Sequence, residues 1–161
     1  MTRPLFIFMD WKSISTHNDK IIKGFFGDYR FLSNFHICDV WFEGLCYPSS
    51  EHAYMAAKAP PEEREPFSNR SLKSSEAKKL GQLVSLLPDW HLTKYNVMLR
   101  VVFEKFASNP ELRNKLLMTG DRYLEETNNW GDRYWGVDFA TGKGDNNLGN
   151  ILVKVREALK V

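Results

Sequence analysis

Short apolar runs bounded by turn residues mark the first third of the chain. Three runs have this pattern, which is typical of β-strands: residues 21–26, 37–42 and 45–47. Glu43-Gly44 lies between the last two runs, so a hairpin is predicted in which Trp41 faces Cys46. A further short strand is predicted within residues 122–127.

The rest of the chain is dominated by apolar residues three and four positions apart, which is the spacing of amphipathic helices. Helices are predicted over residues 50–59, from Ser74 to before Pro88, after Asp89-Trp90, from Pro110 to before Gly120, and after the glycine-rich segment 141–149. The long helix after Trp90 is predicted to turn a core stripe inward: Leu92, Tyr95, Leu99, Val102 and Phe106. The last helix is predicted to bury Ile151, Leu152, Val155 and Leu159.

The composition is ordinary for a globular domain. With 161 residues, 43% of them hydrophobic and 26% charged, the chain is long enough to bury a core of its own. We therefore expect a single α+β domain, mainly helical, with a small antiparallel β-sheet. Residues 1–23 are expected to form an N-terminal lead-in, and residues 24–161 the domain itself.

Charge and cysteine usage narrow the class of protein further. The net charge is +2 and no long basic run is present, so the sequence carries no strong signal for binding a nucleic-acid backbone. No apolar run approaches membrane-spanning length. Cys38 is out of register with Cys46 in the predicted hairpin, so both are expected to be free thiols. These features favour a reducing, cytoplasmic setting, and no zinc-ligand spacing is present.

The stretch from Tyr47 to Lys58 is the leading candidate for chemistry. Ser49 or Ser50 caps the predicted helix, which places Glu51 in the first turn, where the helix dipole favours a carboxylate. Lys58 lies seven residues later on the same helix face, so an acid and an amine share one stripe. The alternative is a surface helix with a solvated acid and lysine.

The segment Tyr29-Arg-Phe-Leu-Ser-Asn-Phe35 is the second candidate. Arg30, Ser33 and Asn34 interrupt an otherwise apolar run, which favours a ligand-facing loop. Arg30 is suited to a phosphate group. The alternative is an ordinary loop whose apolar residues belong to the core.

Two further segments carry polar and aromatic residues together. Asn128–Gly136 places Asp132 between two tryptophans, with Tyr134 and Trp135 beside it, and aromatic faces of this kind stack on a nucleobase. The glycine-rich segment 141–149 opens the last helix, where backbone N–H groups suit a phosphate. The first segment is also compatible with a turn whose tryptophans fill the core.

Several separated motifs coincide with those of a known family. They are Tyr29-Arg-Phe-Leu-Ser-Asn-Phe35, Tyr47-Pro-Ser-Ser-Glu-His52 with Lys58, Asp89-Trp90 with Lys94, Lys105-Phe106, Asn109-Pro-Glu-Leu112, Tyr134-Trp-Gly136 and Gly144-Asp-Asn-Asn-Leu-Gly149. From about Gly24 to its C-terminus the chain resembles the NADAR family, the YbiA-like N-glycosidases. The resemblance implies a domain that hydrolyses N-glycosidic bonds without a metal or cofactor.

The resemblance also implies a set of site residues and substrates. Glu51, Lys58 and Asp132 are the catalytic candidates it gives. The residues it places around the substrate are Arg30, Ser33, Asn34, Trp90, Tyr134, Trp135, Gly136, Asn146 and Gly149. The expected substrates are small ribosylated nucleotides, such as phosphoribosylamino-pyrimidine intermediates of riboflavin synthesis, or ADP-ribosylated guanine in nucleic acid.

Two questions stay open from the sequence. A non-catalytic module that binds ADP-ribose or NAD would use the same aromatic and glycine-rich features without needing Glu51. Lys58 has two possible roles: a fixed positive charge beside Glu51, or an amine that forms a Schiff base with C1′ of an opened ribose. The sequence slightly favours the charge, because a nearby carboxylate raises the pKa of a lysine. It gives no oligomeric state.

Overall fold

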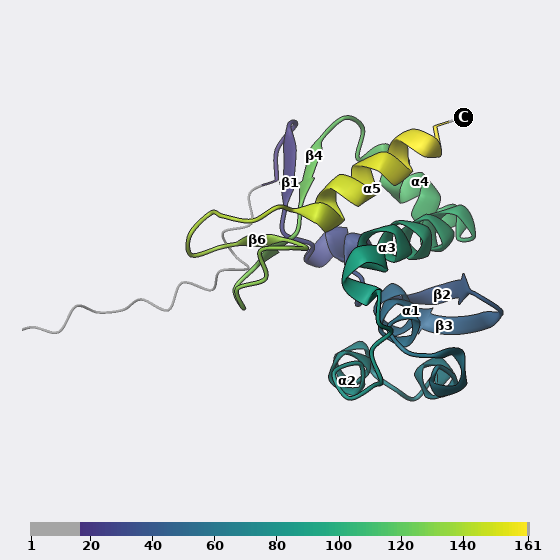
Figure 1. The fold of residues 1–161 in the computed structure, drawn as a ribbon. Coiled ribbons are helices and arrows are strands. Elements are labelled where there is room, and N and C mark those ends of the chain that lie inside the picture. The colour runs from purple at the N-terminus through teal and green to yellow at the C-terminus, as the bar shows by residue number, and fades with distance from the viewer. Residues whose placement is uncertain (1–16, 161) are drawn as a thin grey trace, which may run out of the picture.

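The computed structural model describes residues 17–160 of the chain (Figure 1). Most of the expected lead-in lies outside these residues. The helices, in chain order, are η2 (Gly27–Leu32), α1 (Ser50–Ala57), η3 (Pro61–Glu63), η4 (Glu65–Ser68), α2 (Ser74–Leu80), α3 (Trp90–Ala107), α4 (Pro110–Met118) and α5 (Asn147–Ala158). The strands are β1 (Ile21–Lys23), β2 (Ile37–Phe42), β3 (Leu45–Ser49), β4 (Tyr123–Glu125), β5 (Thr127–Asn128) and β6 (Val137–Asp138). The mixed, mainly helical single domain is confirmed.

The strands pair in a way that the sequence did not predict. Among the strands of residues 17–160, only β2 and β3 form an antiparallel hairpin, whereas β1 pairs with β4 and β5 with β6, both in parallel. Two parallel strands cannot be joined by a tight turn, so no local turn signal in the sequence predicts these pairs, and β1 and β4 also lie far apart in the chain. As a result β1, at the start of the domain, lies beside β4, which comes late in the chain (Figure 1).

The hairpin follows the prediction closely. Trp41 pairs with Cys46, and Glu43-Gly44 forms the turn with positive φ at both residues. Both cysteines are free thiols. The hairpin delivers the chain directly into α1, since β3 ends at Ser49 and the helix begins at Ser50.

Helix α3 is the centre of the core and packs against α1, α4, α5 and the hairpin. Val102 and Phe106 are buried as predicted, together with Met98 and Val101. Leu92 was wrongly placed in this stripe, because it is 74% exposed. Trp90 takes the buried position in the first turn, so the inward face is rotated away from Leu92. Helix α5 buries Ile151, Leu152, Val155 and Leu159 as expected.

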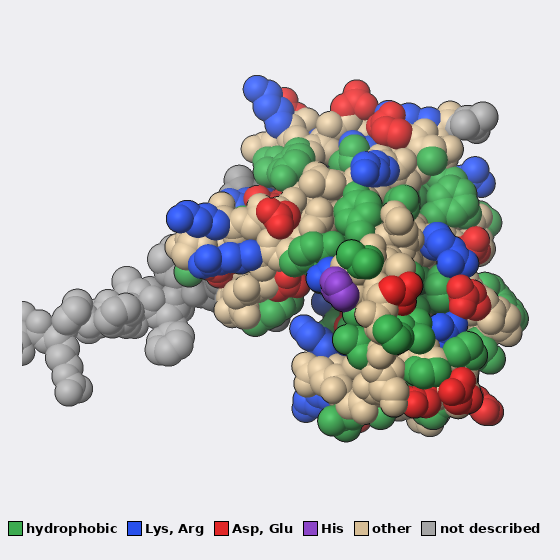
Figure 2. All heavy atoms as spheres, viewed as in Figure 1, with side chains coloured by type: hydrophobic (Ala, Val, Ile, Leu, Met, Phe, Trp, Pro, Cys, Tyr) green, Lys and Arg blue, Asp and Glu red, His purple; other side chains and the backbone are tan. Residues whose placement is uncertain are grey.

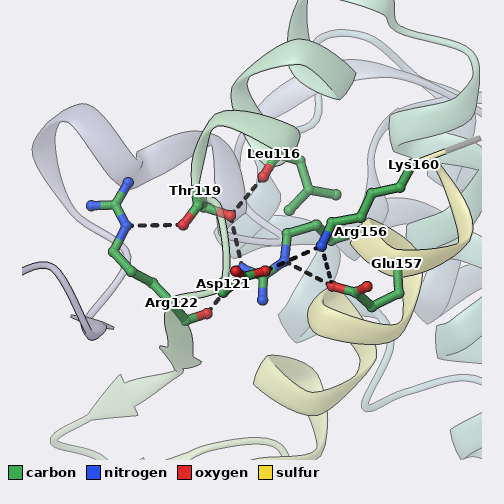
Figure 3. Close-up of polar contacts among 7 residues, drawn as sticks. All are labelled: Leu116, Thr119, Asp121, Arg122, Arg156, Glu157 and Lys160. Atoms are coloured by element: carbon green, nitrogen blue, oxygen red, sulfur yellow. Dashed lines mark hydrogen bonds and ion pairs between the residues drawn. The ribbon is translucent and has the colours of Figure 1, made fainter.

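A buried arginine joins α5 to the turn between α4 and β4 (Figure 3). The guanidinium of Arg156, which is 2% exposed, donates through Nη1 to the Thr119 hydroxyl and to the Arg122 carbonyl, both at 2.9 Å. Thr119 in turn donates to the Leu116 carbonyl at the end of α4. This network holds the C-terminal half of α5 against the turn between α4 and β4.

The surface carries charges of both signs. Figure 2 shows Lys and Arg side chains interspersed with Asp and Glu over the face in view. Among the described residues no helix is long and apolar enough to cross a membrane.

Candidate active site

One cavity brings together six of the twelve site residues predicted from the sequence: Arg30, Ser33, Asn34, Glu51, Asp132 and Trp135. It encloses about 160 Å³, comparable to a cavity that holds a single aromatic ring. Its polar lining residues are Arg30, Ser33, Asn34, Glu51, Lys78, Glu126 and Asp132, and its aromatic ones are Phe25, Phe26, Phe35, Tyr54, Trp130 and Trp135. Met55, Met98 and Leu148 complete the wall. Glu51, Trp135 and the start of α5 therefore meet at one cavity.

Glu51 is buried in the first turn of α1 and faces this cavity. It is 7% exposed, so the interpretation of α1 as a solvated surface helix is wrong. Burial raises the pKa of Glu51 to about 7, and Asp132 raises it too, whereas Lys78 and Lys58 act in the opposite direction. A carboxyl group with this pKa exchanges its proton near neutral pH, which is the property required of an acid–base catalyst.

The neighbours of Glu51 in the motif hold the helix start in place. Ser49 is the N-cap, because its hydroxyl accepts from the His52 N–H at 3.2 Å. His52 Nε2 donates to the Leu72 carbonyl at 2.7 Å, so Nδ1 is the acceptor that meets the Ser49 hydroxyl at 2.6 Å. Burial lowers the pKa of His52, which keeps this neutral tautomer. His52 is therefore an anchor of α1 and does not face the cavity.

The loop that carries Arg30, Ser33 and Asn34 is fastened to several helices. The Asn34 carbonyl accepts from the Glu51 N–H at 3.0 Å, and Asn34 Oδ1 accepts from the Ser50 hydroxyl at 3.1 Å. The Ser33 carbonyl accepts from Nζ of Lys105, which is 1% exposed, at 2.9 Å. The loop and the catalytic candidate Glu51 thus form one rigid unit, with all three predicted loop residues lining the cavity.

Asp132 lines the cavity and also shapes the turn that presents Trp135. One carboxylate oxygen, Oδ1, accepts from the backbone N–H groups of Tyr134 and Trp135, at 3.1 and 2.9 Å. The backbone of Asp132 is held by two hydrogen bonds with the side chain of the buried Asn128. Asp132 therefore has a positioning function that the sequence did not reveal, in addition to its place at the cavity.

The predicted aromatic residues Trp90, Tyr134 and Trp135 form a cluster around Tyr54. Of these three predicted residues, only Trp135 lines the cavity. Its ring lies edge-on to Tyr54 and Tyr134, with centroids 5.5 and 4.7 Å away. Trp90 packs behind Tyr54 at 5.1 Å and is 5% exposed, so it supports the wall from the core. Trp130, which is 56% exposed, lies at the rim with Lys78 Nζ 5.2 Å from its ring centroid.

The glycine-rich segment does not offer its backbone to a phosphate. The N–H groups of residues 145, 146, 147 and 148 donate to the carbonyls of residues 133, 136, 134 and 135, respectively. The predicted phosphate site at the start of α5 is therefore wrong, because these donors already bind the loop that carries Trp135. Arg30 and Lys78 are the cationic side chains that line the cavity among the described residues.

Gly136, Asn146 and Gly149 lie behind the cavity wall. A side chain at Gly136 would collide with the Glu126 carbonyl, and one at Gly149 would collide with the Leu124 carbonyl. Asn146 adopts a left-handed conformation with φ of 53° and is 1% exposed. The structure thus places these three residues at backbone crossings and none of them in the lining.

Lys58 lies at the C-terminal end of α1 and outside the cavity lining. Its Nζ is 3.8 Å from the sulfur of Met55, which does line the cavity. Burial lowers the pKa of Lys58, and the opposing attraction of Glu51 raises it. Both roles foreseen for this amine, a fixed charge and a nucleophile, depend on this balance.

Two ionisable residues of the cavity were not singled out from the sequence. Lys78 belongs to α2, and its position in an amphipathic helix gave no sign that it faces a ligand. Glu126 follows Glu125 in an extended segment, where neighbouring side chains point to opposite faces. That alternation was the available signal that one of the two acids faces inward. Among residues 17–160, no group of His, Cys, Asp and Glu is arranged to hold a metal ion.

The fold and the cavity define a single-domain α+β protein with an acid-lined pocket, and comparison with known proteins identifies its family. The NADAR domain matches residues 19–160. The chain is 35% identical over 137 residues to the N-glycosidase YbiA of Escherichia coli K12, with 83% of this chain and 84% of that protein aligned. The chain belongs to the NADAR family.

Further relatives agree with this assignment. A riboflavin biosynthesis protein of Vibrio vulnificus is 37% identical over 135 residues, and the aligned part is 83% of this chain but only 36% of that protein. The NMR structure of E. coli YbiA matches the fold with a TM-score of 0.76 at 33% identity, over 91% of this chain and 89% of that one.

Proposed function

We propose that this protein is an N-glycosidase that hydrolyses the C–N bond between a ribose and a nitrogenous base. The observation that carries the proposal is the buried Glu51, whose carboxyl group faces a ring-sized cavity beside Asp132 and Trp135. Breaking a ribosyl C–N bond builds positive charge on the sugar, and a carboxylate near C1′ stabilises that charge and activates water.

The rest of the lining supports a nucleotide as the substrate. Trp135 offers an aromatic surface to a base, and Arg30 offers a guanidinium to a phosphate. A module that only binds ADP-ribose or NAD would gain nothing from burying an acid with a pKa near neutrality, because desolvation of the acid costs stability. The geometry therefore favours a catalyst over a binding module.

The substrate class follows from the relatives and from the cavity. We propose either a phosphoribosylamino-pyrimidine or an ADP-ribosylated guanine, since both present an amino-linked base on a ribose that carries phosphate. The test is incubation with a panel of these compounds, NAD and ADP-ribose, with mass spectrometry for the released base. A protein that binds panel members tightly and releases no base would contradict the proposed activity.

Trp135→Ala should weaken nucleotide binding by about 1–3 kcal/mol, the contribution of one stacked base. Calorimetric titration measures the change, and near-UV circular dichroism verifies the fold. Trp41→Ala is the matched control for the loss of an indole ring, because Trp41 is 55% exposed on the hairpin and lies outside the cavity lining. Unchanged affinity in a folded Trp135→Ala protein would make this residue a wall of the core only.

Lys58→Met should lower turnover at least about 10-fold, because either role of this lysine needs its amine. Single-turnover rates with the cleaved panel member measure the effect. Lys58→Arg then separates the roles, since arginine keeps the charge but is not deprotonated. Retained activity identifies the charge, whereas an inactive arginine variant and a sugar trapped on Lys58 by borohydride identify the Schiff base. A fully active Lys58→Met protein would exclude both roles.

A further inference from the structure

The cavity contains a second buried carboxyl group, Glu126, that none of the residue assignments above uses. Its Oε2 atom is buried and receives no hydrogen bond within the described part of the chain. Buried polar atoms in native proteins are nearly always hydrogen-bonded, so an unpaired one requires a reason. Because Glu126 lines the cavity, a group of the ligand is the partner that its position provides for.

The backbone of Glu126 is fixed on both sides. Its N–H donates to Asn146 Oδ1 at 3.0 Å, and its carbonyl accepts from the Val137 N–H at 2.8 Å. Gly136 packs directly against the same carbonyl. The preceding residue points elsewhere, since Glu125 accepts from the Thr127 hydroxyl at 2.7 Å and pairs with Lys23. The scaffold thus directs one acid of the pair into the cavity and holds it there.

The surroundings of Glu126 favour its protonated form. Burial raises its pKa to about 8, against about 7 for Glu51. The other charged groups that act on Glu126 are the acids Asp132 and Glu51, which raise the pKa, and the cations Arg30 and Lys78, which lower it. The buried Lys105 also interacts with Glu126. Glu51 therefore loses its proton at a lower pH than Glu126, so when one proton is shared by the two acids Glu126 holds it.

We propose that Glu126 is the general acid of this site and protonates the nitrogen of the departing base; the inference rests on the proposed N-glycosidase activity. As the C1′–N bond breaks, its electron pair passes to the nitrogen, which takes the proton from the Glu126 carboxyl group. A water oxygen then bonds to C1′, and the proton it loses passes to the Glu51 carboxylate. Exchange with solvent returns one proton to Glu126 and removes one from Glu51.

A general acid at Glu126 and a base at Glu51 together define the chemical class of the leaving group. An amino-linked pyrimidine or a guanine is neutral when bound to ribose, and it would leave as an anion unless a proton arrives. Nicotinamide is different, because the bound pyridinium leaves as a neutral base and needs no acid. Glu126 therefore fits the cleavage of bases attached through a neutral nitrogen.

The test compares Glu126→Gln with Glu125→Gln. Glutamine has the shape of the protonated acid, and Glu125 lies outside the cavity lining, so the second variant is a matched control. With a neutral-nitrogen substrate, Glu126→Gln should lose about 10²-fold or more in turnover, and Glu125→Gln should keep its rate. The fall in turnover above about pH 8 should disappear in Glu126→Gln, since that limb reports the loss of the acid's proton.

A nicotinamide ribonucleotide and an infrared measurement complete the test. If the unsubstituted protein cleaves the nicotinamide compound, Glu126→Gln should cleave it at nearly the same rate. Without any substrate, an infrared band of a protonated carboxyl group should remain at about pH 8, where Glu51 is mostly ionised, and it should be much weaker in Glu126→Gln. An absent band, an unchanged alkaline limb or equal losses on both substrates would overturn the proposal. A protein with the band that cleaves nothing would contradict the N-glycosidase activity alone.

Discussion

Replacing Glu51 with glutamine should lower turnover by about 10²-fold or more, while ligand affinity is largely kept. Glutamine preserves the size and hydrogen-bonding capacity of the side chain but carries no charge and accepts no proton from water. The pKa of Glu51 is about 7, so the unsubstituted protein should also lose activity as the pH falls through 7 and the carboxylate is protonated. In Glu51→Gln that acidic limb should be missing.

The measurement is turnover against pH with the cleaved member of the nucleotide panel, together with calorimetric binding. Glu62→Gln is a suitable control, because it makes the same chemical change at an exposed residue of η3 that does not line the cavity. A folded Glu51→Gln protein with full turnover would refute the assignment of Glu51 as the group that activates water.

Asn146→Ala should lower the free energy of unfolding by about 2–4 kcal/mol. The side chain of Asn146 accepts from the Glu126 N–H and donates to the Leu124 carbonyl and the Tyr123 hydroxyl. Two of these partners are backbone groups, and each one left unpaired in a buried position costs about 1–3 kcal/mol. Alanine also tolerates the left-handed backbone at this position less well than asparagine does.

Thermal and denaturant unfolding measure this loss, which corresponds to a melting temperature lower by roughly 4–16 °C. The same helix supplies a control in Asn150, an exposed asparagine whose side chain donates to the Asp145 carbonyl at 3.2 Å. Asn150→Ala should change stability by less than about 0.5 kcal/mol. Equal losses in the two variants would show that the buried contacts of Asn146 carry no special weight.

Local signals in the sequence were sufficient for the elements next to the site. The Glu43-Gly44 turn set the hairpin register, and the Ser49-Ser50 pair marked the start of α1, so Glu51 could be placed in a first turn. Both are short-range features that the chain encodes within a few residues. The resemblance to a family then grouped Glu51 with Asp132 and Trp135, which lie far apart in the chain and share one cavity.

Long-range features were not available from the same signals. The parallel pairing of β1 with β4 brings together segments about a hundred residues apart, and it positions Glu126. The glycine-rich segment offered N–H groups that suit a phosphate, but the sequence could not show that carbonyls of the Trp135 loop already accept them. The predicted burial of Leu92 was wrong for a related reason, because the elements packed against α3 decide which of its faces is buried.

The four hydrogen bonds from the start of α5 to residues 133–136 make the helix and the loop one cooperative unit. Such a unit opens as a whole, so the loop cannot swing outward unless the first turn of the helix frays with it. Amide hydrogen exchange at positions 145–148 therefore reports whether the loop that carries Trp135 stays in place at the cavity. A bound ligand that stabilises the closed loop should slow exchange there, and more strongly as the ratio of free ligand concentration to Kd rises.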